Sequence, residues 1–205
     1  GGAIKWFEVQ FGEEERISAR KNGTSTFYEM DKKAKGIRAG SDGLIFLPYM
    51  AGERSPVWDK NAKGVYYGLD FSKSRGHFIR ATMEGVAYSL QHNLEAAQSS
   101  GAIVNTLYAI GGASNSRIWT QIKADVTGKK IVVPSSDTAT ALGAAILAGV
   151  GTGVYSSFKD AVDKTVRIQR EHMPNIENNR IYNTMYLKYK SLYQNLKAMM
   201  SGEVL

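Results

Sequence analysis

Hydrophobic and polar residues follow two periodicities along the chain. In residues 75–99, apolar side chains such as Ile79, Met83 and Leu90 recur on one face of a helix. Short apolar runs that end at Pro or Gly predict strands. The predicted strands cover residues 43–48, 106–110 and 130–134, and the predicted helices cover residues 3–9, 24–35, 75–99, 116–126, 141–148, 157–162 and 176–200. This alternation predicts a single α/β domain with at least two parallel strands.

The segments between and after these elements carry weaker signals. Residues 51–68 are rich in Gly, Pro, Asp and Asn and predict a long loop. Residues 137–140 resemble a helix cap before the alanine-rich segment 141–148. The last helix is expected to cover one face of the sheet, with a side that includes Ile181, Met185 and Tyr189.

The strongest local signal is the pair Gly111-Gly112, between the predicted strand 106–110 and the helix that starts near Ser116. Because residues 106–110 are mostly apolar, we expect this strand to be buried. Glycines let the main chain approach a ligand, and a helix start offers unpaired N–H groups with partial positive charge. Taken alone, this turn fits either a nucleotide site or an ordinary tight connection.

Composition excludes several classes of site. The 205 residues contain no Cys and only three His, at 77, 92 and 172, so neither disulfides nor a zinc–thiolate site is possible and no metal site is expected. We find neither an apolar run of membrane-spanning length nor a signal peptide, and expect a cytoplasmic protein without membrane contacts.

The formal net charge of +7 suits an anionic partner, but it equally suits a solvated basic surface. The basic clusters are short, at residues 32–35 and 129–130. Since no nucleic-acid-binding motif is present, we expect no nucleic-acid partner.

Four stretches in order carry a family signature. Residues 46–59 contain a Pro-Tyr pair followed by Gly52-Glu53-Arg54 and Pro56. Residues 61–69 lead into the helix with Glu84-Gly85, residues 111–125 hold the double glycine, and residues 140–145 are rich in small residues. In this order and spacing they resemble the C-terminal half of the FGGY carbohydrate kinases, from residue 1 to about residue 162.

The resemblance implies the actin-like ATPase superfamily, in which two domains of ribonuclease-H-like topology close over ATP and a sugar. It implies that the N-terminal domain supplies the catalytic aspartate and the C-terminal domain holds the adenosine. Residues 1–205 are therefore expected to be the C-terminal nucleotide-binding domain, a fragment incomplete at its N-terminal strands. ATP and Mg²⁺ are the implied cofactors, and no catalytic base is expected in this chain.

The same resemblance implies six contacts with the nucleotide. Gly1 and Lys5 match a motif that flanks it, with Lys5 standing where glycerol kinases carry glutamine. Gly111 and Gly112 match the glycine turn against the nucleotide. Ser116 stands where glycerol kinases carry asparagine near the adenine, and Asn115 beside it is an alternative donor. Residues 140–145 match a helix that closes the pocket.

Other polar residues are expected to be structural. Gln121 and Asp125 lie one helical turn apart, a pattern more typical of capping than of ligand binding. Glu53 and Arg54 lie in a loop that the resemblance places near the interdomain cleft. Glu84 interrupts an apolar helix face and is expected to be buried and hydrogen-bonded.

These observations predict the ATP-binding half of a sugar kinase, inactive as a fragment. Among the subfamilies, the xylulose kinases resemble this chain most, followed by the gluconate kinases. A non-catalytic nucleotide-binding module and a basic nucleic-acid-binding domain are the alternatives. An exposed sheet edge would allow a homodimer.

Overall fold

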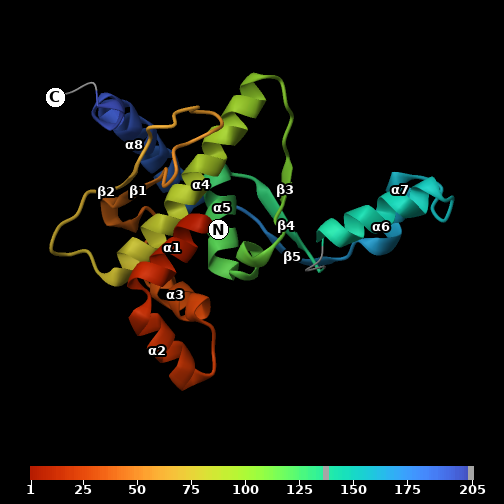
Figure 1. Cartoon of the computed structure of the whole chain (residues 1–205), viewed down its shortest axis with the longest axis horizontal. Helices are drawn as coiled ribbons and strands as arrows, with labels where there is room; N and C mark the ends of the chain where they lie inside the picture. The colour runs from red at the N-terminus through yellow and green to blue at the C-terminus, as the bar shows by residue number, and fades with distance from the viewer. Residues whose placement is uncertain (136–138, 203–205) are drawn as a thin grey trace.

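The structure, a computed structural model, describes residues 1–135 and 139–202 (Figure 1). Its helices are α1 (Gly2–Phe11), α2 (Glu13–Asn22), α3 (Thr26–Lys35), α4 (Arg75–Ser99), α5 (Arg117–Thr127), α6 (Ala139–Gly151), α7 (Phe158–Thr165) and α8 (Ile176–Ser201), with short 3-10 turns η1 (Ser41–Gly43) and η2 (Gly112–Asn115). Its strands are β1 (Ile45–Pro48), β2 (Gly64–Tyr67), β3 (Thr106–Tyr108), β4 (Lys130–Pro134) and β5 (Ile168–His172).

The strands form two small sheets. β1 pairs antiparallel with β2, and the second sheet has the order β3-β4-β5. In that sheet β3 and β4 run parallel, and β5 is antiparallel to β4. The parallel pair, linked through η2 and α5, confirms the predicted α/β organisation.

The core lies between α4, α5 and α8, with α1, α3 and β1 packed around them. Tyrosines fill much of it, since Tyr49, Tyr88, Tyr182 and Tyr189 are each at most 1% exposed. The Tyr189 hydroxyl donates to the Tyr49 hydroxyl at 2.8 Å, which satisfies a polar group inside the core. α4 lies so close to β1 that a Cβ atom at Gly85 would collide with the Phe46 carbonyl oxygen.

Glu84 is the most deeply buried carboxylate of α4, at 1% exposure. It accepts hydrogen bonds from the backbone N–H of Gly40, the Ser41 hydroxyl, the Arg80 Nε and the Tyr182 hydroxyl, at 2.7–3.0 Å. The prediction of a buried, hydrogen-bonded Glu84 is therefore confirmed. The carboxylate joins α4 to α8 and to the turn before β1.

Three elements were not predicted from the sequence. α2 carries too few apolar residues to show a helical stripe, and β5 alternates poorly between apolar and polar residues. The prediction of an uninterrupted loop over 51–68 is wrong, because Gly64–Tyr67 pairs with β1. β2 and β5 each exist through pairing with a partner strand, which local sequence does not reveal.

Two segments are more exposed in the structure than the sequence predicts. The run 106–110 is not a buried strand, because β3 ends at Tyr108 and the exposed fractions of Tyr108 and Ile110 are 65% and 56%. β3 is an edge strand with one described neighbour, β4, which leaves these side chains uncovered. α8 packs on α5, α4 and β1 through its tyrosines, so Ile181 is 45% exposed instead of buried.

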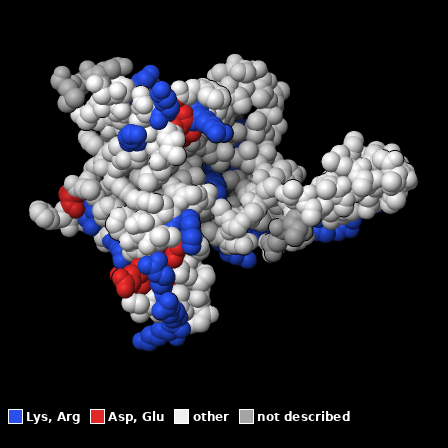
Figure 2. All heavy atoms as spheres, in the orientation of Figure 1, with Lys and Arg blue, Asp and Glu red and all other residues white. Residues whose placement is uncertain are grey.

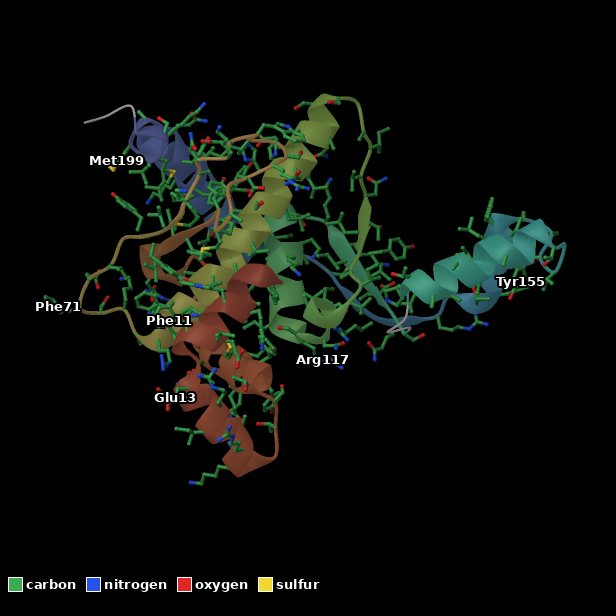
Figure 3. All side chains as sticks on the ribbon, viewed as in Figure 1. Phe11, Glu13, Phe71, Arg117, Tyr155 and Met199 are labelled. Atoms are coloured by element: carbon green, nitrogen blue, oxygen red, sulfur yellow. The ribbon has the colours of Figure 1, made fainter. Side chains whose placement is uncertain are left out.

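α6 and α7 form an arm that extends from the body near the end of β4 (Figure 1). Ile146 is the one buried residue of α6 within the part of the chain that the structure describes. At the far end of the arm, the Tyr155 ring packs against Gly149, where a Cβ atom would lie 2.6 Å from it (Figure 3). α6 is longer than predicted, and residues 137 and 138 of the expected cap lie outside the described residues.

The surface carries its charge in separate groups. On the face shown in Figure 2, Lys and Arg gather over α2 and α8 and along the arm, with Asp and Glu interspersed over α2. Within residues 1–135 and 139–202, every helix is too short or too polar to cross a bilayer.

Candidate nucleotide-binding site

A cavity of about 370 Å³ opens where the start of α1, the start of α3 and the turn η2 meet. Its volume lies in the range of small-molecule sites, roughly 300–1,000 Å³. Figure 1 shows α1, α3 and the beginning of α5 beside one another, and Arg117, labelled in Figure 3, marks the beginning of α5. The residues that line the cavity are Gly1, Ile4, Ser25, Phe27, Tyr28, Asp31, Met83, Gly112, Ala113, Asn115, Ser116 and Trp119.

The N-terminus of α1 forms one end of the cavity. Gly1 is its N-cap residue and has no side chain, so no side-chain oxygen satisfies the first N–H groups of the helix. A helix start of this kind attracts anions through its free donors and its dipole. This end of the cavity is therefore suited to a phosphate.

The η2 turn forms another part of the wall. Gly111 has φ 78°, a left-handed conformation that favours glycine, and its carbonyl accepts the Ser114 N–H at 2.9 Å and the Ser114 hydroxyl at 2.7 Å. Gly112 has an ordinary φ, and a Cβ atom there would have no neighbour within 4 Å. The backbone of Gly112 is thus open to the cavity, while Gly111 fixes the shape of the turn.

Ser116 connects this wall to α3. Its hydroxyl oxygen accepts the Trp119 N–H at 3.0 Å, as the N-cap of α5, and its hydroxyl proton is donated to Asp31 Oδ1 at 2.9 Å. Burial raises the pKa of Asp31, because the ionised carboxylate loses hydration. The hydrogen bond from Ser116 acts in the opposite direction and offsets part of this effect.

Aromatic and apolar groups complete the lining. The Trp119 ring is buried and donates its Nε1–H to the Met83 carbonyl at 2.9 Å, which fixes its orientation. Phe27 and Tyr28 remain 40% and 53% exposed at the start of α3. Flat rings beside a glycine turn suit a planar heterocycle, which stacks on aromatic faces.

Four of the six predicted contacts, Gly1, Gly112, Asn115 and Ser116, lie together around this cavity. Gly111 directly precedes Gly112 in the turn and is not among the lining residues. Lys5 does not line the cavity, because its ammonium group pairs with Glu8 at 2.8 Å and lies 5.6 Å from the centre of the Phe27 ring. The roles of all six as nucleotide contacts stay predictions.

The sequence reasoning missed the contribution of α3, including Ser25, Phe27, Tyr28 and Asp31. Ser25 caps α3 by accepting the Tyr28 N–H at 3.1 Å. Tyr28 and Asp31 stand three residues apart and therefore share a face of the helix. Aromatic residues next to an acidic one on an otherwise lysine-rich helix were the available signal.

The expectation that residues 140–145 close this pocket is wrong for the structure. All the lining residues come from the segment before α6, and the described part of α6 lies in the arm. α6 is apolar on most of its surface, so it has no single apolar face that would hold it over the cavity.

Gln121 and Asp125 are structural, as expected. Asp125 Oδ1 accepts the Gln121 Nε2–H at 2.7 Å and the Asn175 N–H at 2.8 Å, while Oδ2 accepts from Asn178 Nδ2 at 2.8 Å. Asp125 thereby fixes the start of α8. Glu53 accepts the Arg54 N–H at 2.8 Å, a local loop contact outside the cavity.

The sequence comparisons agree on one family. The family model described as "FGGY family of carbohydrate kinases, C-terminal domain" matches residues 1–152. The xylulose kinase of Bacillus subtilis (strain 168) is 30% identical over 199 residues, which are 97% of this chain and 38% of that protein. The gluconokinase of the same organism is 35% identical over 186 residues, 90% of this chain and 36% of that protein. The chain thus spans well under half the length of these relatives.

The fold comparison gives the same result. The crystal structure of xylulose kinase from Rhodospirillum rubrum matches with a TM-score of 0.82 and 29% identity, over 98% of this chain and 39% of that one. The xylulose kinase structure from Lactobacillus acidophilus, 24% identical, shares the fold with a TM-score of 0.85. The model match and these relatives show that the chain belongs to the FGGY family of carbohydrate kinases, as a C-terminal domain.

Proposed function

We propose that this chain is the nucleotide-binding part of a sugar kinase and that the cavity between α1, α3 and η2 holds the nucleoside of ATP. The observation that carries the proposal is the open backbone of Gly112 in the same lining as aromatic side chains, in a cavity of about 370 Å³. The residues fit a nucleotide because the apolar lining suits a base and the start of α1 suits a phosphate.

Phosphoryl transfer depends mainly on positioning and on neutralising charge. In the proposed reaction, the γ-phosphate of ATP passes to a sugar hydroxyl and ADP is left. The cavity would hold the base and ribose, and the backbone N–H groups at the start of α1 would face the phosphates. We propose that Mg²⁺ accompanies the phosphates. The base that accepts the hydroxyl proton is expected in the sugar-binding domain of the complete kinase.

Xylulose is the proposed sugar, because xylulose kinases match nearly the whole chain both in sequence, at 30% identity over 97% of it, and in fold, at 29% identity over 98% of it. Gluconate is the second candidate, supported by gluconokinases that are 35% identical over 186 residues and 34% identical over 204 residues. The residues that would distinguish the two are expected in the sugar-binding domain, so the parent protein must be assayed with both sugars.

Calorimetric titration of the chain with ADP tests the nucleotide site. We expect ADP to bind and inorganic pyrophosphate, the control ligand without a nucleoside, to bind at least about tenfold more weakly, since the lining is mostly apolar. Equal affinity for ADP and pyrophosphate would indicate that the cavity binds anions without recognising the nucleoside. No binding of ADP would reject the proposal.

The chain alone is expected to lack sugar phosphorylation, measured as ADP release with xylulose or gluconate. Turnover above that of a mock purification would contradict the expected division of labour between two domains. A non-catalytic module would bind ADP in the same way, so assaying the parent protein distinguishes these two possibilities.

We also propose that the chain can form a homodimer through β3. Its outer edge has no partner strand among the described residues, and exposed edges promote pairing between copies. Light scattering across a concentration series measures this directly, and a mass that stays monomeric at all concentrations would reject it.

A further inference from the structure

Asp31 is the one carboxylate in the lining of the cavity, within the part of the chain that the structure describes. It comes from α3, an element that was not predicted to contribute to the site. Its neighbours in the lining include Met83 and Trp119, which offer little hydration to a carboxylate. A desolvated carboxylate in such surroundings is favourable only if donors satisfy its oxygens.

One carboxylate oxygen is already satisfied. The Ser116 hydroxyl oxygen takes the Trp119 N–H, so its single proton is committed to Asp31 Oδ1 at 2.9 Å. No described residue donates to the second oxygen, Oδ2. Asp31 therefore lines the cavity with Oδ2 free of described donors, while Ser116 holds Oδ1.

The bond from Ser116 bears on the choice of ligand group. A ribose diol and the N1–H/N2–H edge of guanine each place two donors across both oxygens of a carboxylate, and at Oδ1 the second donor would compete with the Ser116 hydroxyl. The 6-amino group of adenine needs one acceptor only. A 6-oxo purine placed in the same way would face the carboxylate with the lone pairs of its oxo group, which is repulsive, and its N1–H could donate only after the base has shifted.

We propose that Asp31 accepts a hydrogen bond from the exocyclic amino group of the nucleobase and so makes this site select adenine over 6-oxo purines. The proposal rests on the proposed function, because it requires a nucleotide in this cavity. Asp31 would be a specificity residue, and Ser116 would position it through the hydrogen bond to Oδ1.

The experiment compares ADP, IDP, GDP and 2′-deoxy-ADP by calorimetric titration of the chain. IDP differs from ADP in carrying a 6-oxo group in place of the 6-amino group of adenine. We expect the wild-type chain to bind ADP at least about tenfold more tightly than IDP, the loss associated with one charge-assisted hydrogen bond. 2′-Deoxy-ADP should bind about as tightly as ADP.

The variant Asp31→Asn keeps the shape and the bond to Ser116 but presents an NH₂ donor in place of the free oxygen. Its preference for ADP over IDP should fall to about onefold or invert, because the donor suits the 6-oxo group. Glu13→Gln, an exposed carboxylate on α2, is the matched control and should retain the wild-type ratio. Ser116→Ala should weaken the ADP preference without inverting it.

The outcomes separate the two proposals. If the wild-type chain fails to bind any nucleotide, the proposed function falls. If ADP binds but Asp31→Asn keeps the wild-type ADP-to-IDP ratio, the role of Asp31 is rejected and the nucleotide site stands. A large loss with 2′-deoxy-ADP and none with IDP would assign Asp31 to the ribose and reject base selection. Circular dichroism of each variant verifies that it is folded.

Discussion

Ser116 and Asp31, 85 residues apart in the sequence, share a hydrogen bond of 2.9 Å that joins the beginning of α5 to α3 across the cavity. The bond makes the glycine turn and the aromatic side chains of α3 parts of one site. Because burial raises the pKa of Asp31, its titration is coupled to folding.

Asp31→Asn should become more stable relative to wild type as the pH rises from about 3 to 7. Burial raises the pKa of Asp31, so the folded state holds its proton more tightly than the unfolded state. This contribution is complete below the unfolded pKa and is lost as the pH rises through the folded pKa. Urea unfolding of both proteins at several pH values measures the difference, and a constant difference would contradict the coupling.

Gly112→Val should abolish nucleotide binding and leave the free energy of unfolding nearly unchanged. The space beyond Gly112 is open in the structure, so the new side chain would occupy the cavity instead of displacing protein atoms. Titration with ADP and urea unfolding give the two values. Unchanged ADP affinity in a folded variant would remove Gly112 from the site.

Gly111→Ala tests the backbone conformation of the glycine that precedes Gly112. Its φ of 78° is unfavourable for any residue with a Cβ atom, so stability should fall by about 1 kcal/mol. Thermal melting detects this as a lower Tm. A variant as stable as wild type would show that the turn adopts another conformation.

Glu84→Gln should destabilise the chain by about 2–4 kcal/mol, because a buried carboxylate with four donors becomes an amide that faces some of them with its own N–H groups. Tyr182→Phe removes one donor and should cost about 1–2 kcal/mol. Urea midpoints test both, with the exposed Glu13→Gln as control. A loss below that of Tyr182→Phe would contradict the central role of Glu84.

Gly85→Ala should destabilise the chain by about 1–3 kcal/mol, since its methyl group would collide with the Phe46 carbonyl oxygen where α4 meets β1. Gly143→Ala in α6 is the matched control. A Cβ atom at Gly143 has no neighbour within 4 Å, so alanine should stabilise its helix by about 0.5–1 kcal/mol. Destabilisation by both substitutions alike would point to a shared backbone effect instead of the predicted collision.

Local signals in the sequence were sufficient for much of the fold. The long apolar periodicity of α4, and the strand, glycine turn and helix around Gly111, have their causes within a few neighbouring residues. The strands β2 and β5 do not, because pairing with β1 and β4 holds them. The burial of β3 was misjudged for the same reason, since coverage of a strand depends on its neighbours.

The residues of the candidate site also fall into two groups, those that local motifs indicate and those that only the folded structure brings to the cavity. Gly1, Gly112 and Ser116 could be recognised because they belong to motifs, whereas Asp31 acquires its place through a bond to a residue far along the chain. Lys5 was displaced from the cavity by an ion pair with Glu8, one helical turn away. A charged residue near a site forms an ion pair with a carboxylate within its reach, and the folded structure determines which carboxylate that is.

The family model ends at residue 152, yet α8 begins at Ile176 and contributes Tyr182, Tyr189 and Tyr193 to the centre of the core. The end of the family-model match is thus not the end of the packed core. A protein cut at the family boundary would expose the aromatic cluster around Tyr88 and leave Glu84 without its phenol partner. It should behave as an aggregating, partly ordered chain, so expression for crystallography or binding screens must retain α8.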